Sequence, residues 1–322
     1  MAVSPIQPPD LETVDLRAFR SSDIRPLLEE QAALWNGRYR WDFDSSKEVI
    51  LRFVESRSLY GHVLLSGGRI IGYSYFVHES SKALVGDLFI TRHRRAEQAE
   101  RFLFHHTLQS AATMPGVRRI EGQLLGLSFN PFREAVFSRP LTVFERLFMI
   151  TSDLSRAARP AEEPSPVRYG AWTERDLDAT AELIRLAYDR HVDSLINDQY
   201  RNAAGARRFL YNSTQHPGCG VFFAPAALTA LEPKARMLCG ICLGSLVQSN
   251  VGHITQLCVA PFARGKGIGR QLLGRALKAF HQHGCEAVSL TVTGSNDTAK
   301  ALYESSGFRV LQRFPAFVWE NS

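Results

Sequence analysis

The hydrophobic positions in the second half of this 322-residue chain switch between strand-like and helix-like spacing. Apolar runs at 253–259 and 287–292 are typical of strands, and each is followed by a segment with helical spacing, at 269–283 and 297–306. The first of these helices is predicted to turn one row of apolar side chains toward the core: Leu272, Leu273, Ala276, Leu277 and Phe280. This periodicity alone predicts a protein of the α/β class.

The other predicted elements of the same half follow the same alternation: strands at 167–171, 220–223 and 236–247, a helix at 177–187, and a polar helical stretch at 191–211. Residues 225–234 are rich in proline and alanine and are predicted to form a loop between two strands. Gly284 and Gly307 are expected to end the last two helices, because glycine readily adopts the left-handed conformation found after many helices.

A basic, glycine-rich turn joins the strand at 253–259 to the helix at 269–283, and it reads Arg264-Gly265-Lys266-Gly267-Ile268-Gly269-Arg270. Backbone N–H groups that have no Cβ beside them can surround phosphate oxygens, and the positive end of a helix dipole favours an anion. The spacing is neither that of a nucleoside-triphosphate loop nor that of a dinucleotide fingerprint. The turn therefore predicts a different phosphate-bearing ligand.

Two motifs of this half resemble those of the GNAT N-acetyltransferase superfamily. Arg264-x-x-Gly267-x-Gly269 is similar to the Gln/Arg-x-x-Gly-x-Gly/Ala loop that holds the pyrophosphate of coenzyme A in that superfamily. Asn296-x-x-Ala299-x-x-Leu302-Tyr303 is similar to the superfamily's second element, and it follows in the expected order. The resemblance implies a mixed, mainly antiparallel sheet flanked by helices.

The resemblance also implies an activity: transfer of an acetyl group from acetyl-CoA to a primary amine, by direct attack in a ternary complex and without a metal. The backbone of the strand before the loop would pair with the pantetheine arm. The coenzyme A contacts that it implies are Leu257, Cys258, Val259, Arg264, Gly265, Lys266, Gly267, Ile268, Gly269, Arg270, Asn296, Ala299 and Tyr303. Another acyl-CoA or aminoacyl transferase on the same fold, or a non-catalytic acetyl-CoA sensor, are the alternatives.

Two residues are candidates for proton transfer. Tyr303 corresponds to the tyrosine that often protonates the coenzyme A sulfur in the superfamily, although a tyrosine on a helix is also compatible with a place in the core. The superfamily often places a basic carboxylate on the strand before the loop, and His253 stands at the comparable position. A structural histidine, with ordered water as the base, is the alternative for His253.

The acceptor site is expected after the helix at 177–187, in a polar cluster that includes Tyr188, Asp189, His191 and Asp193. Such a cluster suits a cationic or hydroxylated acceptor, and it is equally compatible with a solvated helix face. The acceptor would be a small-molecule or peptide amine. The sequence identifies neither that acceptor nor the oligomeric state.

The first half repeats the pattern of the second. Residues 18–24 match 171–177, and Asn130 precedes Asn296 by the same number of residues as Phe137 precedes Tyr303. The sequence is therefore predicted to contain two tandem GNAT-like domains, at 12–155 and 167–322, joined by a proline-rich linker at 156–166.

The first repeat has lost the phosphate loop, because its turn reads Arg95-Ala96-Glu97-Gln98-Ala99-Glu100 and contains no glycine. Side chains would fill the phosphate space, and the two glutamates would repel a pyrophosphate. Phe137 has no hydroxyl to donate. The first repeat is predicted to have a structural or substrate-shaping role.

Composition narrows the class of protein further. The net charge is +6, but the Lys and Arg residues are dispersed, so a nucleic-acid partner is not expected. The absence of a signal-like N-terminus and of a run of 18 apolar residues predicts a cytoplasmic protein without membrane association. The five cysteines are expected to be reduced, and Cys239 and Cys242 to lie in a strand on opposite faces, which does not suit a metal.

Overall fold

A computed structural model describes residues 10–157, 167–216, 218–233 and 237–321 of the chain. It divides into two compact units, each drawn from separate parts of the sequence. The first unit comprises the chain up to residue 39, residues 43–146, and the chain from residue 313 onward, and the second comprises residues 40–42 and 147–312. Most of the predicted linker, at 158–166, lies outside the described residues.

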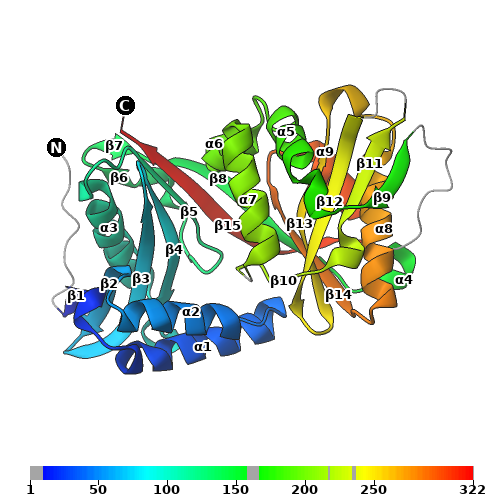
Figure 1. The fold of residues 1–322 in the computed structure, drawn as a ribbon. Helices are drawn as coiled ribbons and strands as arrows, with labels where there is room; N and C mark the ends of the chain where they lie inside the picture. Colours follow the sequence, from blue (N-terminus) through cyan, green and yellow to red (C-terminus); the bar gives the residue numbers. More distant parts are fainter. Residues whose placement is uncertain (1–9, 158–166, 217, 234–236, 322) are drawn as a thin grey trace. The chain divides into compact units, whose positions relative to one another are not determined.

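The elements of the first unit are, in chain order, β1 (Leu11–Asp15), η1 (Leu16–Ala18), α1 (Ser21–Tyr39), α2 (Asp44–Glu55), β2 (Tyr60–Ser66), β3 (Arg69–Glu79), β4 (Lys82–Ile90), η2 (Arg92–Arg94), α3 (Glu97–Thr113), β5 (Arg119–Gln123), η3 (Pro131–Arg133), β6 (Ala135–Val136) and β7 (Arg139–Pro140) (Figure 1). Two clusters of buried side chains form its core. One packs α1 and α2 against the strands, and the other packs α3 against them. The helices therefore cover both faces of this sheet.

The elements of the second unit are α4 (Leu154–Ala157), β9 (Arg168–Ala171), η4 (Glu174–Asp176), α5 (Leu177–Ala187), α6 (Val192–Ile196), η5 (Asp198–Arg201), α7 (Ala203–Gln215), β10 (Val221–Phe222), η6 (Ala224–Ala226), β11 (Leu228–Glu232), β12 (Met237–Gln248), β13 (Val251–Val259), η7 (Pro261–Ala263), α8 (Ile268–Gln282), β14 (Ala287–Thr293) and α9 (Asp297–Ser305) (Figure 1). Helices α5 and α8 both pack on β12 and β13. Gly244 and Gly252 allow the approach of α8, since a Cβ on either would lie within 2.7 Å of the Phe280 ring.

The two strands that remain have residues in both units. β8 (Thr142–Thr151) begins in the first unit and ends in the second, and β15 (Arg309–Glu320) begins in the second and ends in the first. Residues 316–320 of β15 pair antiparallel with β5. The last strand of the chain therefore completes the sheet of the first unit.

The two units share one strand topology. The first has the order β1-β2-β3-β4-β5-β15, and the second has β8-β14-β13-β12-β11-β9. In each unit one pair of strands is parallel, β4 with β5 in the first and β13 with β14 in the second, and the neighbouring pairs β1–β2, β2–β3, β3–β4, β5–β15, β12–β13, β11–β12 and β9–β11 are antiparallel. The pairing with the preceding strand shifts by one residue at Gly86 in β4 and at Thr255 in β13. These matching irregularities agree with the repeat predicted from the sequence.

The predicted fold class, a mixed and mainly antiparallel sheet flanked by helices in each half, is confirmed. One local prediction is wrong, because the proline- and alanine-rich stretch at 225–234 is not a loop throughout. Its residues Leu228–Glu232 form β11, which pairs with β12 on one side and β9 on the other. Partners on both sides offset the weak local strand propensity.

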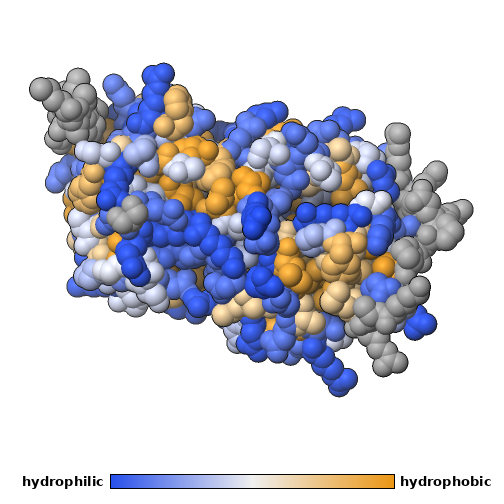
Figure 2. Space-filling model, turned by 90° about the horizontal axis from the view of Figure 1, so that it is seen from above, coloured by the Kyte–Doolittle hydropathy of each residue, from blue (hydrophilic) through white to orange (hydrophobic). Residues whose placement is uncertain are grey.

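The surface mixes hydrophilic and hydrophobic residues, and on the face in Figure 2 the hydrophobic ones gather in patches bordered by hydrophilic ones. The exposed large hydrophobic side chains include Phe132, Phe137, Leu195 and Val221. Single exposed apolar residues are normal on folded proteins. Among the described residues, the structure contains no helix with the length and hydropathy needed to span a membrane.

Candidate active site

The site lies where β13 and β14 part. Their parallel pairing runs from Val251 to Ile254 of β13, but β13 continues to Val259. The backbone of residues 255–259 therefore has its antiparallel partner, β12, on one side and an opening on the other. An extended ligand could pair with that open edge in the way that a further strand would.

A pocket of about 460 Å³ lies at this opening and is lined by residues from four segments of the second unit, within 187–191, 257–259, 263–270 and 296–303. The lining residues are Ala187, Tyr188, His191, Leu257, Cys258, Val259, Ala263, Arg264, Gly265, Gly267, Ile268, Gly269, Arg270, Asn296, Thr298, Ala299, Leu302 and Tyr303. Every coenzyme A contact implied by the resemblance is among them except Lys266, which is exposed. The structure thus brings the two motifs to one cavity.

The glycine-rich turn leaves the start of α8 open to the pocket. Gly265 and Gly267 have positive φ angles of 75° and 73°, which side-chain-bearing residues rarely adopt. Gly267 is the N-cap of α8 and has no side chain to accept a hydrogen bond from the first turn. The first backbone N–H groups of the helix can therefore donate to an anion, at the positive end of the helix dipole.

Arg264 holds this turn in place. Its guanidinium donates to the carbonyl oxygen of Val259 at 3.2 Å and to that of Ala187 at 2.6 Å. These two carbonyls belong to the end of β13 and the end of α5, so one side chain ties both elements to the loop. The positive charge of Arg264 remains at the pocket wall, where it favours an anionic ligand.

Helix α9 contributes the opposite wall. The Asn296 side chain caps this helix by accepting from the Ala299 N–H at 3.2 Å. Tyr303, one turn further on, is 7% exposed, and its ring meets Phe308 edge-on at 5.9 Å between centroids. Tyr303 is therefore packed in the core and reaches the pocket at the same time.

Tyr188 lines the pocket at the end of α5, and Tyr200 stacks on it from outside the lining. Tyr188 and Tyr200 stack with ring centroids 4.4 Å apart, and the Gln256 side chain donates to the Tyr188 hydroxyl at 2.8 Å. Burial, with smaller contributions from neighbouring groups, raises the pKa of Tyr188 well above its usual value of 10. Tyr188 is neutral at physiological pH and donates or accepts hydrogen bonds there.

The structure does not bring His253 to the pocket. His253 lies in the part of β13 that pairs with β14, is 7% exposed, and contacts the Ser289 hydroxyl through Nδ1 at 2.9 Å. Its ring meets the Trp41 ring at 4.9 Å and is absent from the pocket lining. Burial lowers its pKa from 6.5 to about 4. This environment fits the structural alternative for His253.

The cysteine at the pocket is protonated at neutral pH. Burial raises the pKa of Cys258 from 9.0 to about 12, against the opposing effects of Gln256 and Arg264. Its thiol is therefore a poor nucleophile, which disfavours a covalent acyl-cysteine intermediate. Among the residues that the structure describes, no group of three or more His, Cys, Asp or Glu could hold a metal ion.

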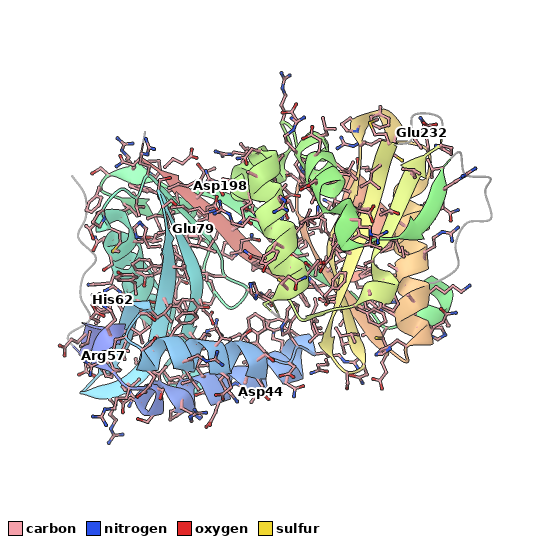
Figure 3. The ribbon with its side chains drawn as sticks, viewed as in Figure 1. Asp44, Arg57, His62, Glu79, Asp198 and Glu232 are labelled. Atoms are coloured by element: carbon pink, nitrogen blue, oxygen red, sulfur yellow. The ribbon has the colours of Figure 1, made fainter. Side chains whose placement is uncertain are left out.

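The polar cluster expected to form the acceptor site divides in the structure. Tyr188 and His191 line the pocket, but Asp189 and Asp193 do not. Asp198, labelled in Figure 3, lies in η5 and is also outside the lining. The sequence reasoning missed Ala187, Ala263, Thr298 and Leu302, of which Thr298 and Leu302 lie inside the recognised second motif and so could have been included.

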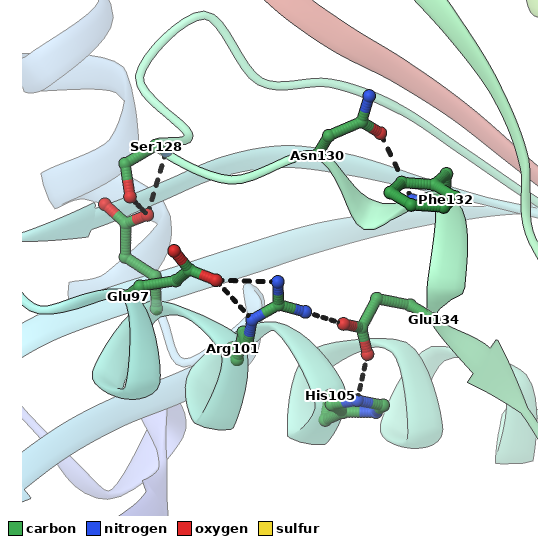
Figure 4. Close-up of polar contacts among 8 residues, drawn as sticks. Glu97, Arg101, His105, Ser128, Asn130, Phe132 and Glu134 are labelled. Atoms are coloured by element: carbon green, nitrogen blue, oxygen red, sulfur yellow. Dashed lines mark hydrogen bonds and ion pairs between the residues drawn. The ribbon is translucent and has the colours of Figure 1, made fainter.

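The corresponding turn of the first unit is closed by its own side chains. The buried Glu100 carboxylate accepts from Arg95 Nε at 2.7 Å and from the Ser128 N–H at 2.9 Å. On the next turn of α3, Arg101 bridges Glu97 and Glu134 (Figure 4). Neither helix start has a side-chain cap, but the second unit has glycines and Arg264 at this turn, whereas the first has Glu97 and Glu100, whose carboxylates are bound to internal partners.

Comparison with known proteins gives one family match. Residues 190–308 match the model of the acetyltransferase (GNAT) family. A mycothiol acetyltransferase of Beutenbergia cavernae is 49% identical over 57 residues, which cover 18% of this chain and 19% of the relative. A mycothiol acetyltransferase of Cellulomonas flavigena is 24% identical over 310 residues, which cover 91% of this chain and 82% of the relative. The first of these matches therefore spans under a fifth of the relative.

Solved structures agree over the whole chain. A GCN5-related N-acetyltransferase of Sphaerobacter thermophilus has a TM-score of 0.65 at 17% identity, covering 97% of this chain and 96% of that one. A tandem GNAT protein of the clavulanic acid biosynthesis pathway has a TM-score of 0.57 at 16% identity, covering 97% and 98%. At sequence identities of 17% and 16%, this structural similarity establishes the fold of the chain.

Proposed function

We propose that the second unit, whose residues 190–308 match the model of the acetyltransferase (GNAT) family, transfers an acetyl group from acetyl-CoA to a primary amine by direct attack in a ternary complex. One observation carries the proposal: the glycine turn, the open edge of β13 and Tyr303 line the same 460 Å³ pocket. A sequence motif alone would not require these three features to meet.

The pyrophosphate and the pantetheine arm of coenzyme A each have a counterpart in this pocket. The pyrophosphate would accept from the N–H groups at the start of α8, beside Arg264 and Arg270. The pantetheine arm would pair with the open backbone of Leu257–Val259, where the pairing with β14 has ended. An N–H of this strand would then polarise the thioester carbonyl.

Tyr303 would act as the acid. As the amine attacks, the carbon–sulfur bond breaks, and the departing thiolate takes the proton of the Tyr303 hydroxyl. Direct attack is favoured over a covalent route because the Cys258 thiol stays protonated at neutral pH.

Coenzyme A would bind to the second unit alone. The argument is the contrast between the uncapped N–H groups at Gly267 and the carboxylates that occupy the first turn of α3. The first unit would then serve to support or shape the enzyme.

The acceptor would be a small-molecule or peptide amine. The names of the relatives make the acceptor of mycothiol acetyltransferases the first compound to test. A panel would add glucosamine, cysteamine, spermidine and a peptide with a free N-terminus.

The test is to incubate the full chain with isotope-labelled acetyl-CoA and either this panel or a cell extract, and to identify labelled products by mass spectrometry. We expect a labelled amide that forms roughly 10²-fold more slowly when Tyr303→Phe replaces the wild type at equal concentration. Binding of acetyl-CoA without any labelled product would instead favour a sensor. A product labelled only from another acyl donor would change the donor.

A further inference from the structure

We propose that His191, held in place by Asp193, is the base that accepts the proton of the attacking amine. The inference rests on the acetyltransferase activity proposed above and assigns a role in that reaction that neither recognised motif supplies.

His191 stands out among the side chains that reach the pocket. The titratable residues of the lining are Tyr188, His191, Cys258, Arg264, Arg270 and Tyr303. Arginine stays protonated at neutral pH, tyrosine and cysteine titrate well above it, and burial moves Tyr188 and Cys258 further in that direction. The imidazole is the group in this set whose ordinary range includes neutrality. The described lining contains no carboxylate.

Four residues form a chain of contacts through His191. Asp193 Oδ2 lies 3.6 Å from His191 Nδ1, and the other oxygen of this carboxylate accepts from the Thr293 hydroxyl. On the far side of the ring, Asn296 Nδ2 lies 3.3 Å from His191 Nε2. Thr293 ends β14 and Asn296 caps α9, so two elements of the site fix the orientation of the imidazole.

These contacts indicate which ring nitrogen is basic. Asn296 Oδ1 accepts from the Ala299 N–H, so its Nδ2 points to His191 and donates to Nε2. Nε2 then carries the lone pair, which an acceptor amine would take over from Asn296, and the proton resides on Nδ1, 3.6 Å from the Asp193 carboxylate. The backbone N–H of Asp193, 3.2 Å from Nδ1, would be the competing partner in the opposite tautomer.

Among the described residues, no carboxylate other than that of Asp193 lies at ion-pair distance from His191. The titratable and charged groups on the neighbouring elements are Tyr188 and Asp189 of α5 and its end, Asp198 and Arg201 of η5, Arg264 before α8, and Asp297, Lys300 and Tyr303 of α9. Several of these charges are engaged elsewhere, since Lys300 pairs with Asp297 at 2.7 Å and Arg201 donates to the Ser194 carbonyl. Within the described residues, Asp193 is the carboxylate at ion-pair distance from His191.

With Tyr303 as the acid, every proton of the proposed reaction is accounted for. One proton of the acceptor ammonium passes to Nε2 of His191, and the freed nitrogen lone pair forms a bond to the thioester carbon. The carbon–sulfur bond breaks, the Tyr303 proton passes to the thiolate, and the Tyr303 oxygen takes the second proton that the nitrogen loses. After product release His191 returns its proton to solvent, so no further reactant is consumed.

His191→Asn is the informative variant. His191 is the N-cap residue of α6, and asparagine is a preferred N-cap residue, so the helix start can be retained while the base is lost. Asp193→Asn removes the charge that stabilises an imidazolium. His281→Gln, an exposed histidine in the last turn of α8, is the matched control.

Kinetics on the full chain test the role first, with acetyl-CoA and the acceptors of the panel. We expect His191→Asn to lower kcat by roughly 10² to 10⁴-fold at neutral pH while KM for acetyl-CoA changes little. The defect should shrink as the pH passes the pKa of the acceptor amine, because the amine then needs no base. Asp193→Asn should show a smaller loss of the same kind, and His281→Gln none.

Nitrogen NMR of the full chain labelled at histidine gives a readout that needs no acceptor. The signal missing from His191→Asn identifies the imidazole, and we expect it to show an unprotonated Nε2 that responds to acetyl-CoA. A protonated Nε2 in the neutral ring, or a His191→Asn enzyme with the wild-type pH profile, would overturn the proposal. An equal loss at every pH with a raised KM for acetyl-CoA would also overturn it, in favour of a role in holding Asn296. If the wild type binds no acetyl-CoA, the proposed function itself fails, and the tautomer still reports on the pair.

Discussion

We expect that replacing His253 by glutamine makes the free energy of unfolding of the second unit depend less on pH in the acidic range. His253 is 7% exposed, and burial lowers its pKa from 6.5 to about 4. Glutamine keeps a polar group for the Ser289 hydroxyl, which lies 2.9 Å from Nδ1 in the wild type. The substitution therefore removes the titration while the contact can be retained.

The sign and the size of this pH dependence follow from the pKa of His253 in the unfolded chain, 6.5, and in the folded chain, about 4. Between pH 6.5 and about pH 4 the unfolded chain binds a proton at this histidine and the folded chain does not, so stability falls as the pH is lowered. The loss is about 2 kcal/mol near pH 5 and about 3 kcal/mol at pH 4 and below. Above pH 6.5 both states are neutral at this position, and the contribution is constant.

Urea unfolding of the wild type and of His253→Gln at a series of pH values between 4 and 8 would measure the difference. We expect the stability difference between the two proteins to change by about 2 kcal/mol between pH 8 and pH 5, in favour of the variant at low pH. The exposed His281→Gln should show no such change. A pH-independent difference for His253→Gln would mean that His253 is not buried as the structure has it.

Further predictions concern the pocket. Gly267→Glu should weaken acetyl-CoA binding by more than about 10-fold, because the φ of 73° at this position suits glycine and the new carboxylate would face the phosphates. Lys266→Ala removes one exposed charge and should weaken acetyl-CoA binding by less than about 5-fold. Equal effects of the two substitutions in calorimetry would contradict the binding of the phosphates by backbone N–H groups. Calorimetry on the full chain should give one acetyl-CoA per chain, and two sites would contradict the closed turn at Glu100 in the first unit. Tyr303→Phe keeps the ring in the core, so turnover should fall by roughly 10²-fold with little change in acetyl-CoA affinity, and a fully active variant would return this tyrosine to a structural role.

The sequence by itself determined the features that rest on local signals. The glycine turn, the N-cap at Asn296 and the amphipathic α8 are each encoded within about one or two helical turns of chain, where spacing and backbone freedom leave few alternatives. The repeat was also visible, because both copies keep the same order of elements. These signals were sufficient for the α/β class, and the resemblance of two motifs to the GNAT superfamily added the mixed sheet and most of the residues that line the pocket.

How distant residues combine depends on the three-dimensional packing of the chain. The position of His253 before the loop suits catalysis in the sequence, but the β13–β14 pairing extends to Ile254, so His253 lies within the paired region and packs on Trp41, more than 200 positions earlier in the chain. The role proposed for the His191–Asp193 contact depends on Thr293, which contacts Asp193, and on Asn296, which contacts His191. In both cases the deciding contacts join segments far apart in the sequence, and local periodicity carries no information about such contacts.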